Sequence, residues 1–230
     1  AAVAPALFVL GALTQRLLIQ PLMTARDEHV QIFATVGLST ALMNLALLIF
    51  GADIANTPAH GVRSQVMLGE VRILTGQLWV FVAAIVLVIG LQLFMKKTRT
   101  GRAIRATAQN RAAARLMGIN DKFIYILTFG LGAACVGLGS SLIAPLYPTS
   151  PTIGTYFVLI AFVCVVLGGL GSIPGAFFGA LVIGLVDALS GFYIGSDLRE
   201  AVVFTIFLLI LILKPSGLFG TRMNLSHVSP

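Results

Sequence analysis

The sequence predicts an all-α protein, a polytopic bundle of transmembrane helices, and two observations carry this prediction. Of its 230 residues, 58% are apolar and 10% are charged, whereas an ordinary soluble domain is about one quarter charged. Residues 123–186 form a stretch of 64 residues without a charge, and about 20 apolar residues suffice for one helical crossing of a bilayer. The composition therefore argues against a soluble domain.

Uncharged segments define about seven expected crossings in one permease-like domain, residues 1–230. Prolines at 145–151 and the glycine-rich break at 168–175 divide the longest uncharged stretch into three, because both features interrupt helices. Residues 1–15 are expected to be the tail of an earlier helix. The remaining expected spans are residues 30–52, 73–95, 123–143, 155–168, 175–194 and 201–213.

The distribution of basic residues predicts the orientation. Eight of the fifteen Lys and Arg residues lie between Lys96 and Lys122, and such residues accumulate in cytoplasmic loops. With seven crossings, twelve basic residues lie inside and three lie outside, namely Arg63, Arg72 and Arg199. We therefore expect a multi-pass protein of the bacterial inner membrane, with a cytoplasmic C-terminus and a cytoplasmic basic loop at residues 96–122.

Signatures of catalysis are missing from the sequence. The three histidines are isolated, and neither a Cys/His metal-ligand spacing nor a nucleophile elbow occurs. The chain has no Gly-Lys dipeptide and hence no P-loop for ATP phosphates. We expect no enzymatic activity, no metal, no cofactor in this chain and no nucleic-acid partner. ATP-driven transport would need a separate ATPase subunit.

The basic loop contains the signals of a short, capped helix. Asn110 is a favourable N-cap, the residues after it are helix formers, and Gly118 suits the left-handed position that ends a helix. Asn120 or Asp121 then caps the next span. A short rigid helix at the membrane surface suits the transmission of a push from a partner. The alternative is a basic loop that only sets topology.

Three motifs make the sequence similar to a known family. They are residues 100–106 (TGRAIRA) with 113–120 (AAxxxGIN), residues 167–176 (LGGLGSIPGA) and residues 214–220 (KPSGLFG). Together they resemble the permease subunits of bacterial branched-chain amino acid ABC transporters. The chain looks like a member that lacks its N-terminal spans, since it begins at Ala1 rather than at Met and its first apolar run is short.

The resemblance implies an inner-membrane channel for branched-chain or related small amino acids. Its implied partners are a second, homologous permease, two cytoplasmic ATPases, a periplasmic substrate-binding protein and membrane lipid. Many import permeases carry Glu-Ala-Ala-x-x-x-Gly in the ATPase-docking loop, and here Ala112 replaces the Glu, so that Arg111 and Arg115 are the alternative polar contacts. The implied coupling residues are Arg102, Arg105, Arg111, Ala113, Ala114, Arg115 and Gly118.

Polar residues in the expected spans are candidates for a substrate pathway. Asp187 is the one acid inside an expected span, where an unpaired charge costs roughly 2.5–3.5 kcal/mol. It is expected to face the bundle interior, water or a partner, or to play a structural role. Irregular backbone at membrane depth can line a cavity, although both breaks can equally be surface turns. The candidates are Asn44, Asp187, Thr152, Thr155, Tyr156 and Ser172.

Two further patterns predict local structure. Gly171, Gly175 and Gly179 recur every four residues, with Ala180 and Gly184 continuing the series, which favours close helix packing. Outside the membrane, residues 66–68 and 71–74 flank Gly69-Glu70 as a small hairpin. This outer loop is a candidate contact for a binding protein or a solvated connector.

Several functions remain open at this point. Urea, a short amide or a sugar is an alternative substrate within the same superfamily. An ion-coupled secondary transporter is a further alternative, but one embedded acid makes a poor relay. A membrane scaffold without transport is the third.

Overall fold

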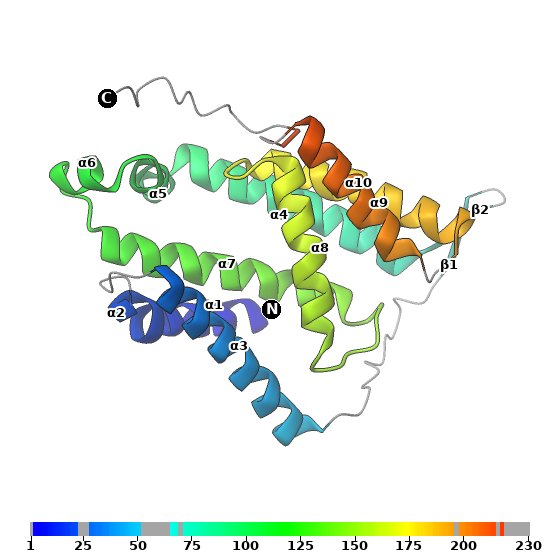
Figure 1. Cartoon of the computed structure of the whole chain (residues 1–230), viewed down its shortest axis with the longest axis horizontal. Helices are drawn as coiled ribbons and strands as arrows, with labels where there is room; N and C mark the ends of the chain where they lie inside the picture. Colours follow the sequence, from blue (N-terminus) through cyan, green and yellow to red (C-terminus); the bar gives the residue numbers. More distant parts are fainter. Residues whose placement is uncertain are drawn as a thin grey trace. The chain divides into compact units, whose positions relative to one another are not determined.

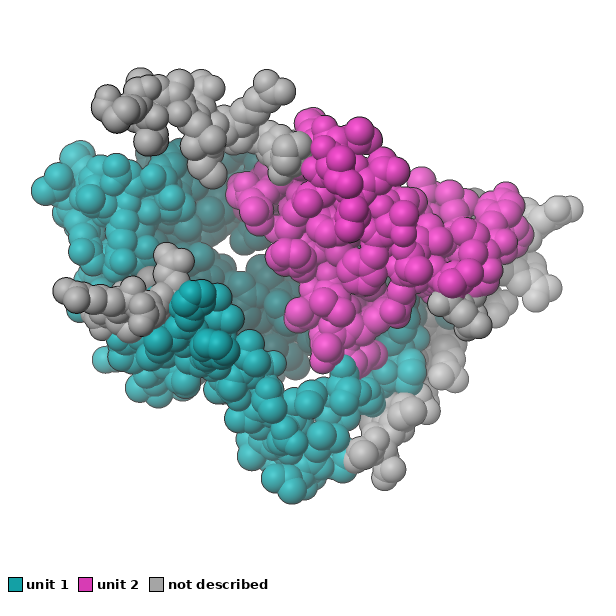
Figure 2. Space-filling view, viewed as in Figure 1, with its two compact units in different colours: residues 1–152 teal, residues 153–230 magenta. Residues whose placement is uncertain are grey.

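The computed structural model describes residues 2–22, 28–51, 65–68, 71–195, 198–214 and 217–218. The chain divides into two compact units, Ala1–Thr152 and Ile153–Pro230, which are coloured separately in Figure 2. The predicted class, an all-α bundle, is confirmed, with one small hairpin added. That residues 1–230 form a single permease domain stays a prediction.

The first unit contains the basic loop and four long apolar helices. Its helices and strands are α1 (Val3–Thr14), the π-helical turn η1 (Gln15–Ile19), α2 (Gln20–Leu22), α3 (Glu28–Phe50), β1 (Gln65–Leu68), β2 (Val71–Leu74), α4 (Thr75–Lys97), α5 (Arg99–Gln109), α6 (Arg111–Leu116) and α7 (Asp121–Ile143). In Figure 1, α5 and α6 lie at the end of the unit where α7 begins.

Small residues hold α1 against α7. A Cβ on Gly11 would lie 2.6 Å from Cβ of Ala133, and one on Gly137 would lie 2.7 Å from a methyl carbon of Leu7. Gly130 is likewise buried, against Phe8. A Cβ on Gly11 would also lie 3.3 Å from Cα of Gly130, so the two helices approach closely through small residues, as is typical of helix pairs in membranes.

In its described part, the second unit has three helices, α8 (Ile153–Gly168), α9 (Ile173–Tyr193) and α10 (Arg199–Leu213). Its core contains Val163 and Leu167 of α8, Ile183 of α9 and Val203 of α10, each at most 4% exposed. The turn between α8 and α9 has left-handed backbone at Gly169 (φ 101°) and Gly171 (φ 89°). Glycine adopts this conformation without steric cost, which explains why the break is rich in glycine.

Among the residues that the structure describes, five helical segments are long and apolar enough to cross a membrane: Val3–Leu22, His29–Phe50, Thr75–Lys97, Asp121–Ile143 and Ile173–Tyr193. Helix α8 has 16 residues and α10 has 15, so the count of seven crossings stays a prediction. The expected end of the first span at residue 15 was wrong. The helix continues to Leu22 because Leu17, Leu18 and Ile19 extend its apolar run beyond Arg16.

Of the two predicted local patterns, the hairpin is confirmed and the glycine series is confirmed only in part. The hairpin is confirmed, with β1 and β2 antiparallel and Leu68 paired with Val71. The glycine series is confirmed in its middle, since Gly175 and Gly179 are buried. It does not extend to Gly184, where an added Cβ would meet nothing within 4 Å.

Candidate functional site

The basic loop forms two helices, and α5 is anchored to the end of α4 at its first turn. The Thr98 side chain accepts a hydrogen bond from the Gly101 backbone N–H at 2.9 Å and caps α5. A Cβ on Gly101 would lie 2.5 Å from the Phe94 carbonyl oxygen and 2.6 Å from Cα of Met95. Glycine is therefore required for α5 to turn sharply back on α4. Ile104 and Thr107 are the buried side chains on the inner face of α5.

Helix α6 has the predicted caps at both ends. Asn110 separates α5 from α6 by its extended backbone (φ −152°, ψ 103°). Its side chain accepts a hydrogen bond from the Ala113 N–H at 3.0 Å and so caps α6. Gly118 has the predicted left-handed backbone, with φ 80°. The Ile119 N–H then donates to the Ala114 carbonyl oxygen at 3.1 Å, as in a Schellman motif. Six helical residues are thus held in a fixed frame.

A cluster of three charged side chains joins α6 to α7. Oδ2 of Asp121 accepts hydrogen bonds from Nε of Arg111 and from a terminal nitrogen of Arg115, both at 2.7 Å. The Asp121 side chain is 8% exposed. The guanidinium of Arg111 also lies over the Tyr125 ring, 5.2 Å from its centroid, a favourable cation–π distance.

The Asp121 carboxylate keeps the cluster ionised. Its hydrogen bond and negative charge raise the pKa of the Arg115 guanidinium above its ordinary value. Asn120 completes the junction, because its side chain caps α7 by accepting from the Phe123 N–H at 3.3 Å. Arg111 and Arg115 are therefore both paired within the chain, a partner that the sequence analysis did not identify.

The remaining predicted coupling residues lie around this frame. Arg102, Arg105, Ala113 and Gly118 are exposed, whereas Ala114 is 4% exposed and packs inward. Two apolar residues at the end of α6, which the sequence did not single out, are strongly exposed: Leu116 is 89% and Met117 is 82% exposed. These two form an apolar knob, defined as the side chains of Leu116 and Met117.

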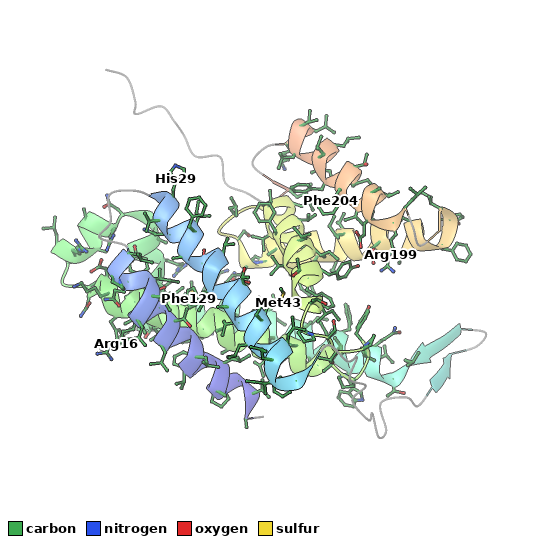
Figure 3. All side chains as sticks on the ribbon, turned by 60° about the horizontal axis from the view of Figure 1, so that its bottom comes forward. Arg16, His29, Met43, Phe129, Arg199 and Phe204 are labelled. Atoms are coloured by element: carbon green, nitrogen blue, oxygen red, sulfur yellow. The ribbon has the colours of Figure 1, made fainter. Side chains whose placement is uncertain are left out.

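Asp187, the embedded acid, pairs with Arg199 within the second unit. Nε and a terminal nitrogen of Arg199 donate to the two carboxylate oxygens of Asp187. The Asp187 side chain is 21% exposed and the Arg199 side chain is 39% exposed. Arg199 is the first residue of α10, as Figure 3 shows, and Asp187 lies in the last two turns of α9. The ion pair therefore joins these helices and neutralises the acid.

Ser172 has a structural partner, and the glycine-rich break binds the third motif. The Ser172 side chain accepts from the Gly175 N–H at 3.1 Å and caps α9. The Leu218 N–H donates to the Leu167 carbonyl oxygen at 2.7 Å. A Cβ on Gly217 (φ 78°) would lie 2.7 Å from the Gly169 backbone. Two of the motifs noted in the sequence thus meet in one backbone contact.

The other predicted pathway residues are exposed. Asn44 donates to the Thr40 carbonyl oxygen of its own helix at 2.8 Å. Thr152 lies within 3.2 Å of the Ser150 hydroxyl, and Tyr156 makes an edge contact with Phe157. Along α9, Ser172 and Asp187 lie near opposite ends, about 22 Å apart at 1.5 Å per residue. Within the second unit, the structure thus separates Ser172 and Asp187 by most of the length of α9.

No group of three or more His, Cys, Asp or Glu side chains that could hold a metal ion occurs among the described residues. Cys135 and Cys164 are both free thiols. Within the described ranges, the capped and clamped helix α6 is the site whose geometry follows most directly from the sequence.

Comparison with known proteins identifies the family. Residues 1–213 match the family described as "Branched-chain amino acid transport system / permease component". The chain is 32% identical over 197 residues to the high-affinity branched-chain amino acid transport system permease protein LivH of Escherichia coli K12. The matched residues cover 83% of this chain and 64% of LivH. It is 32% identical over 199 residues to the corresponding protein BraD of Pseudomonas aeruginosa, covering 84% and 65%.

A shorter match reaches another kind of importer. The chain is 39% identical over 97 residues to the ribose import permease protein RbsC of Escherichia coli K12, covering 39% of this chain and 30% of RbsC. No solved structure matches the chain significantly. The family match spans nearly all described residues, and the apolar helices agree with it. This chain is a multi-pass membrane protein that belongs to the permease-component family of branched-chain amino acid transport systems.

Proposed function

We propose that this chain is the membrane-spanning permease subunit of an ATP-driven importer for branched-chain or related small amino acids. The names of LivH and BraD support this substrate class, although the chain spans about two thirds of the length of each. In the proposal it resides in the bacterial inner membrane with a cytoplasmic C-terminus, and it performs no covalent chemistry.

The proposed complex contains four kinds of partner. They are a second, homologous permease, two cytoplasmic ATPases that bind the ATP, a periplasmic substrate-binding protein and the surrounding lipid. The exposed apolar face of α3 fits an environment of lipid or a second permease, since Phe33, Leu48 and Phe50 are each at least 74% exposed and such residues avoid water.

One observation carries the coupling role: α6 is a short helix that is rigid on one side and apolar on the other. Asp121 ties its two arginines to the first turn of a span, as described above. On the free side, the apolar knob stands 82–89% exposed, which is unusual for Leu and Met beside a basic loop unless a partner covers them. A displacement of α6 would therefore be transmitted to α7.

This geometry changes the expected role of the arginines. In the proposal, Arg111 and Arg115 hold α6 in place, and the apolar knob enters a cleft of the ATPase. Arg102 and Arg105, exposed on α5, provide long-range attraction to that subunit. ATP-bound and ATP-free ATPases would then bias two arrangements of the bundle by their different affinities for each.

The test is co-purification of the ATPases with the permease. Leu116→Asp with Met117→Asp should reduce the amount of bound ATPase roughly ten-fold or more, because hot-spot side chains typically contribute 2 kcal/mol or more. The matched control is Gln109→Asp, which adds a charge at an exposed position of α5. Normal ATPase recovery with the double variant would refute the docking role of α6.

The pathway residues remain part of the proposal. Asn44, Thr152, Thr155, Tyr156, Asp187 and Ser172 are proposed to line the route or to shape it. Cysteines placed at these positions should react with a water-soluble thiol reagent in the assembled transporter and should be protected by substrate. The pairing of Asp187 with Arg199 argues against a lone carboxylate that carries protons in an ion-coupled transporter.

A sugar is the second candidate substrate, favoured by the similarity of 97 residues to the ribose permease. Uptake of labelled leucine and labelled ribose by proteoliposomes with the complete complex distinguishes the two. We expect uptake of leucine. Uptake of ribose alone would move the proposal to the sugar importers while leaving the coupling role intact.

A further inference from the structure

An open groove lies between the end of the first span and the beginning of α7. It has a volume of about 670 Å³, and its lining includes Arg16, Leu17 and Gln20 from the first span and Lys122 and Phe123 from α7. Volumes of about 300–1,000 Å³ are typical of sites for small ligands. Both helices are long and apolar enough to cross the membrane, so their ends place the groove at the boundary between membrane and water.

The groove is shaped by an irregular turn of the first helix. The backbone N–H of Gln20 donates to the Gln15 carbonyl oxygen, so that residues 15–19 form a π-helical turn. Pro21 follows and has no N–H for the helix. Single π-turns inside helices occur often at functional sites. Here the turn places Arg16 on an exposed face, where Figure 3 shows its side chain pointing away from the helix.

The lining combines two cationic side chains with two exposed apolar side chains. Arg16 and Lys122 are exposed, and neither is among the residues in a salt bridge of the described chain. Asp121, next to Lys122, is already neutralised by Arg111 and Arg115. Leu17 is 68% and Phe123 is 57% exposed beside these cations. The surface thus attracts an anion that carries hydrocarbon.

Gln20 adds a polar group without a partner. Its side-chain carbonyl oxygen is buried and has no hydrogen-bond donor among the described residues. Such a group costs free energy unless a donor reaches it. Because Gln20 lines the groove, a hydroxyl donor on a molecule bound there would satisfy this oxygen.

We propose that this groove binds one anionic phospholipid with a hydroxyl-bearing headgroup, such as phosphatidylglycerol, from the leaflet on the side of the basic loop. Its phosphate lies between Arg16 and Lys122, a headgroup hydroxyl donates to Gln20, and its acyl chains extend along Leu17 and Phe123. Basic pockets between membrane helices bind the headgroups of anionic lipids. The site is independent of the transport substrate.

The experiment is native mass spectrometry of the detergent-purified full chain, titrated with phosphatidylglycerol or phosphatidylcholine. We expect one phosphatidylglycerol to bind tightly and to resist exchange by phosphatidylcholine. Arg16→Gln and Lys122→Gln should each weaken this binding roughly five-fold, the usual contribution of a cation near a membrane surface. The matched controls are Lys96→Gln and Lys97→Gln, exposed cations at the end of α4, which should leave it unchanged.

Three results would overturn the proposal. Equal affinity of the unmodified chain for the two lipids would show that the groove does not select the anionic headgroup, and this comparison needs no variant. Equal losses with the α4 variants would show a general charge effect. Displacement of phosphatidylglycerol by glycerol phosphate at similar concentration would show that a soluble phosphate, rather than a lipid, occupies the groove.

Discussion

Arg111 donates a hydrogen bond from Nε to Oδ2 of Asp121 at 2.7 Å, across ten residues of sequence that include a helix end and a turn. This contact joins the helix that follows Asn110 to the first turn of α7. Because the same oxygen also accepts from Arg115, one carboxylate fixes both ends of α6. The movement of the loop and the movement of the span are thereby linked.

Replacing that carboxylate should uncouple the loop from the span. In Asp121→Asn, the amide cannot neutralise both arginines, so α6 should exchange its amide hydrogens faster while the remaining helices keep their protection. We expect uptake by the reconstituted transporter to fall roughly five-fold or more, at the lower end of typical coupling effects. Hydrogen-exchange mass spectrometry and uptake assays measure the two effects.

Asp121→Glu is the matched control, since it keeps the charge and should recover most of the uptake. Unchanged exchange of residues 111–117 in Asp121→Asn would contradict the clamp, whatever happens to transport. A loss of the protein from the membrane in both variants would instead indicate a role in insertion.

The end of α6 depends on one left-handed residue. Gly118 has φ 80° and open space around a hypothetical Cβ, so a substitution there is opposed by backbone strain and not by a clash. Gly118→Val should therefore destabilise the loop by about 1–2 kcal/mol, whereas Gly118→Asn should cost less, because Asn tolerates this conformation. Equal exchange rates of residues 111–117 in the two variants would contradict this explanation.

The α8–α9 pair supplies a matched test of backbone packing. A Cβ on Gly179 would lie 2.5 Å from the Cys164 carbonyl oxygen, and one on Gly184 would meet nothing within 4 Å. Gly179→Ala should cost about 1–3 kcal/mol through overpacking, and Gly184→Ala should gain about 0.5–1 kcal/mol. Thermal unfolding in detergent measures both. The same melting temperature for both variants would show that these helices do not pack as described.

The ion pair of α9 and α10 can be tested by exchanging its charges. Asp187→Asn and Arg199→Gln each leave one charged partner, which should lower the amount of folded protein more than loss of both does. The double variant Asp187→Arg with Arg199→Asp should restore folded protein. If the swapped protein folds but does not transport, Asp187 has a pathway role beyond its structural one; full transport would remove it from the pathway.

Local signals in the sequence predicted much of this structure. The caps at Asn110 and Asn120, the left-handed Gly118 and the hairpin around residues 69–70 follow from residue preferences over a few positions. The span boundaries agree within about two residues for most helices, because charged residues, prolines and glycines end the apolar runs. Such signals act within one or two helical turns and are visible in sequence order.

The tertiary partners were not predictable in the same way. Asp121 was considered as a cap, and its two arginine partners appear only once the turn at Gly118 is built. Asp187 required Arg199, twelve residues away and beyond the end of its helix. The spacing of Gly130 and Gly137 was a visible signal for the packing with α1, because both lie on one face of α7. The first helix was expected to end near Arg16, although its apolar run continues.

In the proposed complex, the apolar knob of α6 contacts an ATPase subunit. A photoreactive benzoylphenylalanine at position 116 of the full chain, illuminated in membranes that contain the assembled transporter, tests this contact directly. We expect a cross-link to the ATPase at position 116 and none at position 138, which is exposed in the last third of α7, away from the basic loop. A cross-link to lipid or to another protein at position 116, with no ATPase adduct, would contradict it.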